Sequence, residues 1–360
     1  MNDEQQMLRD SAERYLRDNY DFAARQAIAD QGIGIDEQHW QNFVAMGWTA
    51  MSFTEQDGGF GFGLAAIGQL AELFGYHLVR EPMLESALLA GEVIAAGTEE
   101  AKQSLLPAIM DGSALATIPY PTDTGPELSE RNGGRTVRGR LEYVPSGGTA
   151  THLVTPASHG SAPAWVIVDL QAPGVQRQTF LTHDGRLGAH VTLDTDLEDS
   201  DLLLSGDDAQ QMQTTVYQRA MLLAAAEGVG AMQGALDLTV DYTRQRQQFG
   251  QPLSAFQALQ HRMADMLIQV ELARSLVTAA CDAVDGNSDQ ALTLSLAAKA
   301  KVDSAARRVT QEAIQMHGGI ATTNEYRVGH YFKRMALLES WPQHRDQVIE
   351  AFIQGRQPVN

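Results

Sequence analysis

Residues 246–266 read RQQFGQPLSAFQALQHRMADM, and this stretch says more about the fold than any other. Its apolar positions recur every three or four residues, which is typical of one buried face of a long helix. We predict that this helix follows Pro252. The apolar positions concerned are 249, 253, 256, 259, 263, 266, 267 and 270.

A set of polar residues lies at the entrance to this predicted helix. Arg246, Gln248 and Gln257 are not needed to form an apolar face. The start of a helix presents unpaired backbone N–H groups, and a guanidinium forms strong hydrogen bonds with phosphate oxygens. The stretch therefore predicts a site for the diphosphate of a dinucleotide.

Two further motifs show which family the chain resembles. Residues 315–320 read QMHGGI, followed by EY at 325–326 and GHYFKR at 329–334. Near the amino terminus, a predicted helix at 40–48 leads into EQDGGFG at 55–61. Together with residues 246–266, these motifs closely resemble the acyl-CoA dehydrogenase family over almost the whole chain.

Composition favours a helical cytoplasmic enzyme. The chain has 360 residues, of which 44% are hydrophobic, so it can bury large cores and should divide into two or three domains. We expect no targeting segment and no membrane span. The single cysteine, Cys281, lies in a helical context and is predicted to be a small core residue rather than a catalytic thiol.

The order of helix-like and strand-like segments along the chain predicts three domains, in a mainly α fold with a β middle domain. Helical patterns cover 1–112, short β-like segments between Gly, Pro and Thr clusters cover 113–205, and helical patterns return over 206–360. We interpret these regions as a helical domain, a β-barrel or sandwich, and a four-helix bundle. The same order is found in the acyl-CoA dehydrogenase architecture.

Charge argues against nucleic acid as a partner. The net charge is -19, which leaves no excess of cations to replace phosphate counterions. Residues 244–360 hold 13 Lys plus Arg against 11 Asp plus Glu, whereas residues 1–243 hold 13 against 34. A helical core with few surface acids explains this distribution, and so does a region that receives an anionic cofactor or coenzyme A.

The resemblance implies an FAD-dependent oxidoreductase of lipid β-oxidation. In this family a glutamate removes the α-proton of an acyl-CoA thioester, the β-hydride goes to the flavin, and electron-transfer flavoprotein is the expected acceptor. By resemblance, the residues expected to bind FAD, usually that of a neighbouring subunit, are Arg246, Gln248, Phe249, Gln257, Gln315, Gly318 and Gly319. Each has an ordinary alternative: Arg246 as a surface ion pair, Phe249 as core, and Gly318 with Gly319 as a helix break.

The catalytic glutamate of the family is missing at both of its usual places. One place, counted from Tyr331, falls near Trp341, and the other, counted back from Arg246, falls near Ala220. Glu227 and Glu339 are the nearest acids. Glu227 lies two turns along its helix, and Glu339 would require a shift of two residues, so the catalytic base is left unassigned.

The middle domain also departs from the family pattern. The loops that usually cover the flavin correspond to residues 118–123 and 143–148, which lack the family's motifs. A chain that keeps the predicted diphosphate-binding residues but lacks these loop motifs resembles the small or β subunits of heteromeric acyl-CoA dehydrogenases, such as the pimeloyl-CoA dehydrogenase small subunit. Such a chain would act with a homologous partner that supplies the base.

Three hypotheses therefore remain from the sequence. The first is a subunit of a heterotetrameric acyl-CoA dehydrogenase whose partner supplies the glutamate. The second is a non-catalytic scaffold that keeps the fold. The third is a self-sufficient homotetramer that uses Glu339.

Overall fold

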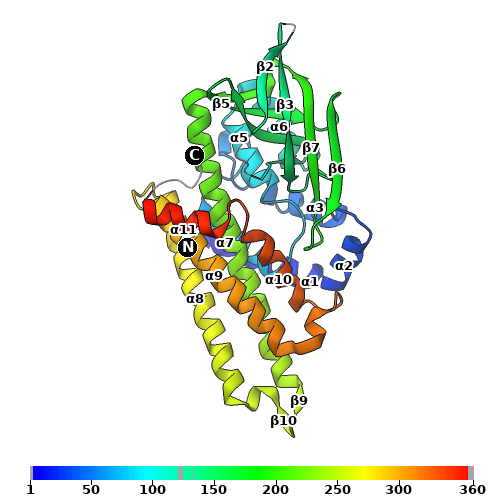
Figure 1. The fold of residues 1–360 in the computed structure, drawn as a ribbon, viewed down its shortest axis with the longest axis vertical. Helices are drawn as coiled ribbons and strands as arrows, with labels where there is room; N and C mark the ends of the chain where they lie inside the picture. Colours follow the sequence, from blue (N-terminus) through cyan, green and yellow to red (C-terminus); the bar gives the residue numbers. More distant parts are fainter. Residues whose placement is uncertain (1–2, 121–124, 132, 356–360) are drawn as a thin grey trace. The chain divides into compact units, whose positions relative to one another are not determined.

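The structure is a computed structural model that describes residues 3–120, 125–131 and 133–355 (Figure 1). Helices occupy the first part of the chain. They are α1 (Asp3–Asn19), α2 (Phe22–Asp30), α3 (Glu37–Ala45), η1 (Trp48–Ala50), η2 (Glu55–Asp57), α4 (Leu64–His77), η3 (Ser86–Ala90), α5 (Gly91–Ala95) and α6 (Glu99–Met110). Local sequence explains their starts: Asp36 caps α3 and Thr98 caps α6 through hydrogen bonds to backbone N–H groups.

The middle of the chain forms one eight-stranded sheet. Its path is β6-β7-β3-β2-β4-β5-β8, with β1 paired to β4. The strands are β1 (Ala116–Thr117), β2 (Glu127–Arg131), β3 (Gly134–Val144), β4 (His152–His159), β5 (Ala162–Asp169), β6 (Val175–Leu181), β7 (Leu187–Leu197) and β8 (Leu202–Ser205).

Two burial patterns show how the sheet is covered. Along β7, Val191, Leu193 and Leu197 are buried while the residues between them include exposed Asp194 and Asp196, as expected for a strand with one face in a core. In β5 the run 164–168 is buried throughout. Both faces of β5 are therefore covered, in contrast to the one-sided burial of β7.

The carboxy-terminal part is helical again. It contains α7 (Gly206–Gln245), β9 (Gln247–Gln248), β10 (Gln251–Pro252), η5 (Leu253–Ala255), α8 (Gln257–Asp285), α9 (Ala291–His317), η6 (Gly318–Thr322), α10 (Val328–Leu338) and α11 (Arg345–Gln354). The predicted order of helices, strands and helices is thus confirmed. Within the described residues, no helix is long and apolar enough to cross a membrane.

The predicted helix after Pro252 begins later than expected. Residues 247–252 form a two-stranded hairpin, in which Phe249 and Gly250 both have positive φ, and α8 starts at Gln257. Positive φ at both central positions is typical of a tight hairpin turn, and this turn interrupts the helical pattern. The prediction of one buried apolar face was wrong at Phe249 and Leu267, which are 90% and 46% exposed, but Met266 and Val270 are buried as expected.

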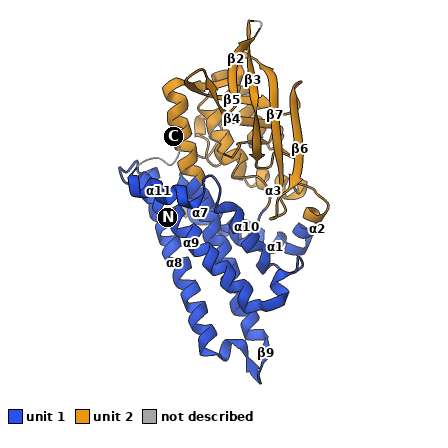
Figure 2. Cartoon of the chain, viewed as in Figure 1, with its two compact units in different colours: residues 1–27, 63–79, 221–360 blue, residues 28–62, 80–220 orange. Residues whose placement is uncertain are grey.

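Two compact units divide the chain (Figure 2). Unit 1 contains residues 1–27, 63–79 and 221–360, and unit 2 contains residues 28–62 and 80–220. The units are discontinuous in sequence, because the segment around α4 belongs with the carboxy-terminal helices. The domain boundaries after residues 112 and 205 stay predictions.

Close backbone contact between α4 and α7 organises unit 1. A Cβ atom on Gly75 would lie 1.8 Å from the carbonyl oxygen of Glu227, and one on Gly230 would lie 1.7 Å from the carbonyl oxygen of Glu72. No side chain fits in either place, so glycine allows the two helices to touch. Cys281 is buried nearby at 3.4 Å from the corresponding position of Gly68, as its prediction as a core residue requires.

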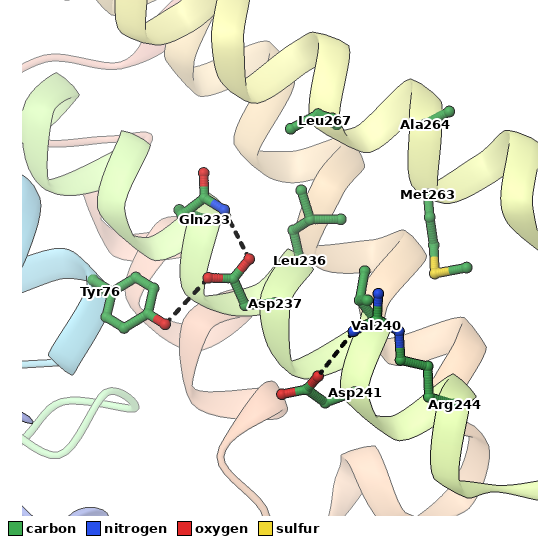
Figure 3. Close-up of a pocket in the computed structure, with 10 residues that line it drawn as sticks. All are labelled: Tyr76, Gln233, Leu236, Asp237, Val240, Asp241, Arg244, Met263, Ala264 and Leu267. Carbon is green, nitrogen blue, oxygen red and sulfur yellow. Dashed lines mark hydrogen bonds and ion pairs between the residues drawn. The ribbon is translucent and has the colours of Figure 1, made fainter. Parts of the chain in front are cut away.

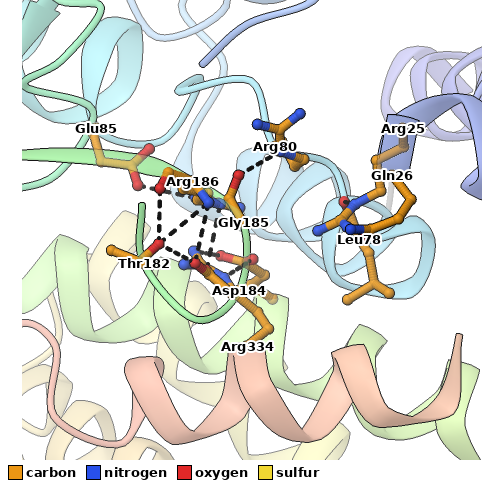
Figure 4. Close-up of polar contacts among 11 residues, drawn as sticks. Arg25, Gln26, Leu78, Arg80, Glu85, Thr182, Asp184, Gly185, Arg186 and Arg334 are labelled. Carbon is orange, nitrogen blue, oxygen red and sulfur yellow. Dashed lines mark hydrogen bonds and ion pairs between the residues drawn. The ribbon is translucent and has the colours of Figure 1, made fainter. Parts of the chain in front are cut away.

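A buried polar network fixes the turn between β6 and β7 in unit 2 (Figure 4). The Arg80 side chain donates hydrogen bonds to the carbonyl oxygens of Gly185 and Ile33 at 3.0 and 2.6 Å. Arg186 forms an ion pair with Glu85 at 3.1 Å. Arg80 is 2% exposed, so these hydrogen bonds are needed to offset the removal of its charge from water.

Candidate functional site

The predicted diphosphate residues Arg246, Gln248 and Phe249 lie on or beside the exposed hairpin. Arg246 directly follows α7, and its backbone N–H donates to the carbonyl oxygen of Tyr242 at 2.8 Å. Gln248 lies in β9 with an exposed side chain. Phe249 is 90% exposed, and its ring contacts that of Phe256 edge-on at 6.1 Å between centroids. The hairpin therefore presents a cation, an amide and an aromatic ring to its surroundings.

Gln257 is the first residue of α8 and is exposed. Phe256, which precedes it, makes no side-chain hydrogen bond that caps the helix. An uncapped start of a 29-residue helix leaves backbone N–H groups available to an anion. This feature agrees with the phosphate-binding chemistry predicted for the stretch.

Gln315, Gly318 and Gly319 lie where α9 ends. All three are exposed, Gly318 has a φ of 68°, and a Cβ atom on either glycine would meet nothing within 4 Å. The positive φ shows that Gly318 ends the helix, as the ordinary interpretation supposed. The open space around both glycines also leaves room for a ligand to approach the backbone closely.

Aromatic contacts connect this helix end to the hairpin side of the bundle. Tyr242 donates a hydrogen bond to the carbonyl oxygen of His317 at 3.2 Å, and the two rings stack at 4.4 Å between centroids. Tyr326 lies against the His317 ring at 5.2 Å. Because Tyr242 is one turn before Arg246 and His317 directly precedes Gly318, the two predicted motifs lie at the same end of the bundle.

Neither predicted position of the catalytic glutamate carries an acid in the structure. Ala220 is buried in α7 with 2% of its surface exposed, and Trp341 is 4% exposed in the loop after α10. An alanine methyl group and an indole cannot remove a proton from carbon. These two positions therefore offer no base, and a catalytic glutamate outside this chain stays a prediction.

Glu227 is engaged in a buried ion pair within unit 1. Both of its carboxylate oxygens accept hydrogen bonds from Arg334, at 2.6 and 2.8 Å, and the two side chains are 1% and 6% exposed. This two-point geometry is the strongest arrangement for an arginine and a carboxylate. A carboxylate held in this way is a structural element and is poorly suited to accept a substrate proton.

Glu339 follows the last residue of α10 and is also paired. Its carboxylate lies 3.2 Å from Arg345 and 3.5 Å from Arg307, and 17% of the side chain is exposed. The prediction of a helix-end acid agrees with this position, although the side chain is less exposed than a surface residue. Two guanidinium groups therefore already occupy the carboxylate of Glu339.

The structure describes only part of the stretches that correspond to the family's flavin loops. Residues 121–123 lie outside the described residues. Tyr143, near the end of β3, lies between the rings of Tyr120 and Phe180, at 5.9 and 6.0 Å between centroids. Gly188 makes this arrangement possible, because a Cβ atom there would lie 2.8 Å from Tyr143.

Sequence reasoning missed a pocket in unit 1 between α7, α8 and the end of α4 (Figure 3). Its volume is about 530 Å³, and its lining includes Tyr76, Gln233, Asp237 and Met263. The Tyr76 hydroxyl and the Gln233 amide both donate to the Asp237 carboxylate, at 3.1 and 2.8 Å. Burial, followed by the charge of Asp237, raises the pKa of Tyr76 to about 12. Tyr76 is therefore a hydrogen-bond donor at neutral pH, and only the spacing of Gln233 and Asp237 on one helix could have indicated the pair.

The geometry fits an organic anion better than a metal ion. Exposed Arg246 and Gln248, the uncapped start of α8 and the open glycines at 318–319 all offer donors or space to a phosphate group. Among the residues that the structure describes, no group of three or more His, Cys, Asp or Glu could hold a metal ion. These donors suit a phosphate group, and the dinucleotide site stays a prediction.

Comparison with known proteins shows the family of this chain. Residues 2–113 match the acyl-CoA dehydrogenase N-terminal domain and residues 209–342 match the acyl-CoA dehydrogenase C-terminal domain. Acyl-CoA dehydrogenase IpdE2 of Mycobacterium tuberculosis is 31% identical over 343 residues, which cover 94% of each chain. The chain therefore belongs to the acyl-CoA dehydrogenase family, a class of flavoprotein oxidoreductases whose cofactor, FAD, is also that of this chain.

Solved structures show the same fold. A variant of the Tcur3481-Tcur3483 steroid ACAD is 26% identical, with a TM-score of 0.87 over 98% of this chain and 97% of that one. The ChsE4-ChsE5 complex from Mycobacterium tuberculosis is 22% identical, with a TM-score of 0.91 over the same shares. The second likeness concerns the fold alone.

Proposed function

We propose that this chain is a subunit of an FAD-dependent acyl-CoA dehydrogenase and that a homologous partner subunit supplies the catalytic base. The reaction is the α,β-desaturation of an acyl-CoA thioester. A base takes the α-proton, and the FAD takes the β-hydride, so that a carbon–carbon double bond forms. The proposal gives this chain the binding of the cofactor diphosphate and gives its partner the proton transfer.

The absence of an available carboxylate supports this division of roles. Counting from the motifs puts the family's two glutamate positions near Ala220 and Trp341. The nearest acids, Glu227 and Glu339, are each paired with arginine. A general base must come within hydrogen-bond reach of the proton that it removes, and both carboxylates are already engaged with guanidinium groups.

The cofactor role rests on the hairpin and the end of α9. Arg246 and Gln248 would donate to the diphosphate, and the exposed ring of Phe249 would lie against the adenosine. Gln257, Gln315, Gly318 and Gly319 would complete the site. These groups point outward from their own chain, which favours a cofactor shared between subunits.

A heteromeric partner fits two of the solved relatives. Tcur3481-Tcur3483 and ChsE4-ChsE5 are both pairs of proteins by name. We propose the same kind of assembly here, with electron-transfer flavoprotein as the acceptor. One relative is described as a steroid ACAD, and we propose a thioester with a bulky ring system as the substrate class.

The visible absorption spectrum tests this proposal. The chain is purified alone and again after co-expression with a homologous acyl-CoA dehydrogenase subunit. We expect flavin absorption bands at about 370 and 450 nm only in the co-expressed complex. Stoichiometric flavin in the lone chain, reduced by added acyl-CoA, would refute the division of roles and favour a homotetramer that uses Glu339.

A further inference from the structure

A second pocket lies entirely within unit 2, and none of the residues expected to bind FAD lines it. Its volume is about 270 Å³, and it lies between η2, α5 and the first half of α7. The apolar part of the wall comes from Phe53, Ala95, Ala96 and Met212, and the polar part comes from Ser52, Thr54, Asp57, Glu92 and Arg219. Apolar and polar groups therefore meet in one small cavity.

Several polar atoms of this pocket have no hydrogen-bond partner in the described structure. Oε2 of Glu92 and Oγ of Ser52 are both buried and make no hydrogen bond. Arg219 contacts Oε1 of Glu92 at 3.0 Å, while 28% of the Arg219 side chain is exposed. Buried polar atoms are normally satisfied, so two unsatisfied atoms beside a guanidinium indicate a place for a polar ligand.

The charges around Glu92 come from three neighbouring elements. Arg219 of α7 is the cation in contact with it. Asp57 of η2 accepts a hydrogen bond from Thr54 at 2.7 Å and lies 3.8 Å from Lys102 of α6. Since Asp57 already has a hydroxyl and an ammonium as neighbours, the group open to a ligand is the Arg219 and Glu92 pair.

Burial raises the pKa of Glu92, and Arg219 only partly opposes this effect. A protonated Glu92 would turn Oε2 from an acceptor into a donor. The pocket would then present three donors together: the Arg219 guanidinium, the Ser52 hydroxyl and the Glu92 carboxyl. Such a set complements a carboxylate, which only accepts hydrogen bonds when it is ionised.

We propose that this pocket binds a small organic carboxylate, with its anionic group between Arg219, Ser52 and Glu92 and its aliphatic part against the apolar wall. The inference does not depend on the proposed acyl-CoA dehydrogenase activity. When the ligand binds, Arg219 exchanges its contact with the Glu92 carboxylate for a contact with the ligand carboxylate. Glu92 therefore takes up a proton as the ligand enters. Affinity should therefore fall about tenfold per pH unit above the pKa of Glu92.

Isothermal titration calorimetry of the full chain with sodium butyrate tests the proposal. Titrations in two buffers with different ionisation enthalpies give the number of protons taken up. We expect saturable binding with uptake of about one proton per butyrate at about pH 7.5. Inorganic phosphate, which has no aliphatic part, is expected to bind more weakly at the same concentrations.

Three variants distinguish the site from general ionic attraction. Arg219→Gln is expected to weaken butyrate binding by about tenfold to a hundredfold, because a charge-assisted hydrogen bond is lost. Glu92→Gln keeps a donor and should bind butyrate without proton uptake. Arg138→Gln is the matched control, since Arg138 is 76% exposed and distant in sequence from the pocket residues, and it should change nothing.

Each result decides the proposal. Butyrate binding that is unchanged in Arg219→Gln, or proton uptake that persists in Glu92→Gln, would overturn it. Phosphate binding as tight as butyrate binding would also overturn it, because the apolar wall would then contribute nothing. If Arg219→Gln does not fold by circular dichroism, Arg219→Lys replaces it and should lose binding by a smaller factor in the same direction.

Discussion

The substitution Arg334→Gln removes the guanidinium from the buried Glu227 carboxylate. Both hydrogen bonds of this pair are short, at 2.6 and 2.8 Å, and neither side chain is more than 6% exposed. The carboxylate then stays in a poorly solvated place without its strongest neighbour. Removal of one partner from a buried pair typically costs about 3–5 kcal/mol.

This cost converts into a measurable shift in the melting temperature. For a chain of this length that unfolds as one unit, about 3–5 kcal/mol corresponds to roughly 4–7 °C. We expect differential scanning fluorimetry to show this loss for Arg334→Gln. The double variant Arg334→Gln with Glu227→Gln should recover part of it, because no unbalanced charge remains buried.

A surface ion pair supplies the matched control. Arg308 and Asp265 lie 3.4 Å apart with side chains 58% and 59% exposed. Arg308→Gln should cost less than about 1 kcal/mol, because water and salt screen exposed pairs. A melting temperature for Arg334→Gln as high as that for Arg308→Gln would refute the structural role of the Glu227 pair and return Glu227 to the search for a base.

Three further predictions concern other parts of unit 1. Gly230→Ala should lower the free energy of unfolding, measured by chemical denaturation, by about 2 kcal/mol or more, because α4 and α7 must move apart. Gly319→Ala is the control and should leave the free energy of unfolding unchanged, because Gly319 lies in open space. Burial, then the charges of Arg327 and Arg17, lowers the pKa of His77 to about 4. The unfolded chain therefore binds the proton first, and stability should decrease by up to about 3 kcal/mol as pH falls from about 6.5 to 4, a decrease that His77→Gln should remove from pH-dependent melting curves. Phe249→Ala should change the melting temperature little, since the ring is 90% exposed. The same variant should lower the flavin content of the purified complex. An unchanged flavin content would count against a contact between Phe249 and the cofactor.

The order of helices and strands could be predicted because periodicity and turn residues act locally. The helical pattern predicted over 1–112 includes α6 (Glu99–Met110), whose start is set by the Thr98 cap. The helix after Pro252 was placed too early because an apolar period continues through the hairpin. Only the φ values of Phe249 and Gly250, which a period cannot reveal, show the turn.

The candidate site could be predicted as a set of motifs but not as an arrangement. Counting from the motifs puts Ala220 and Trp341 at the two places expected for the glutamate, and this assignment stays a prediction. It could not show that Glu227 is held by Arg334, because those residues are far apart in sequence and meet only through packing of α7 and α10. The pocket of Glu92 and Arg219 was missed for the same reason.

The turnover of Glu339→Gln in the assembled complex tests the central claim most directly. Of the two acids nearest the expected positions, Glu339 is the more exposed, with 17% of its side chain exposed against 1% for Glu227. With a steroid-type acyl-CoA substrate, we predict that the rate of flavin bleaching near about 450 nm stays within about twofold of the parent complex. A decrease of about a hundredfold or more, with flavin content unchanged, would contradict the account and assign the base to this chain.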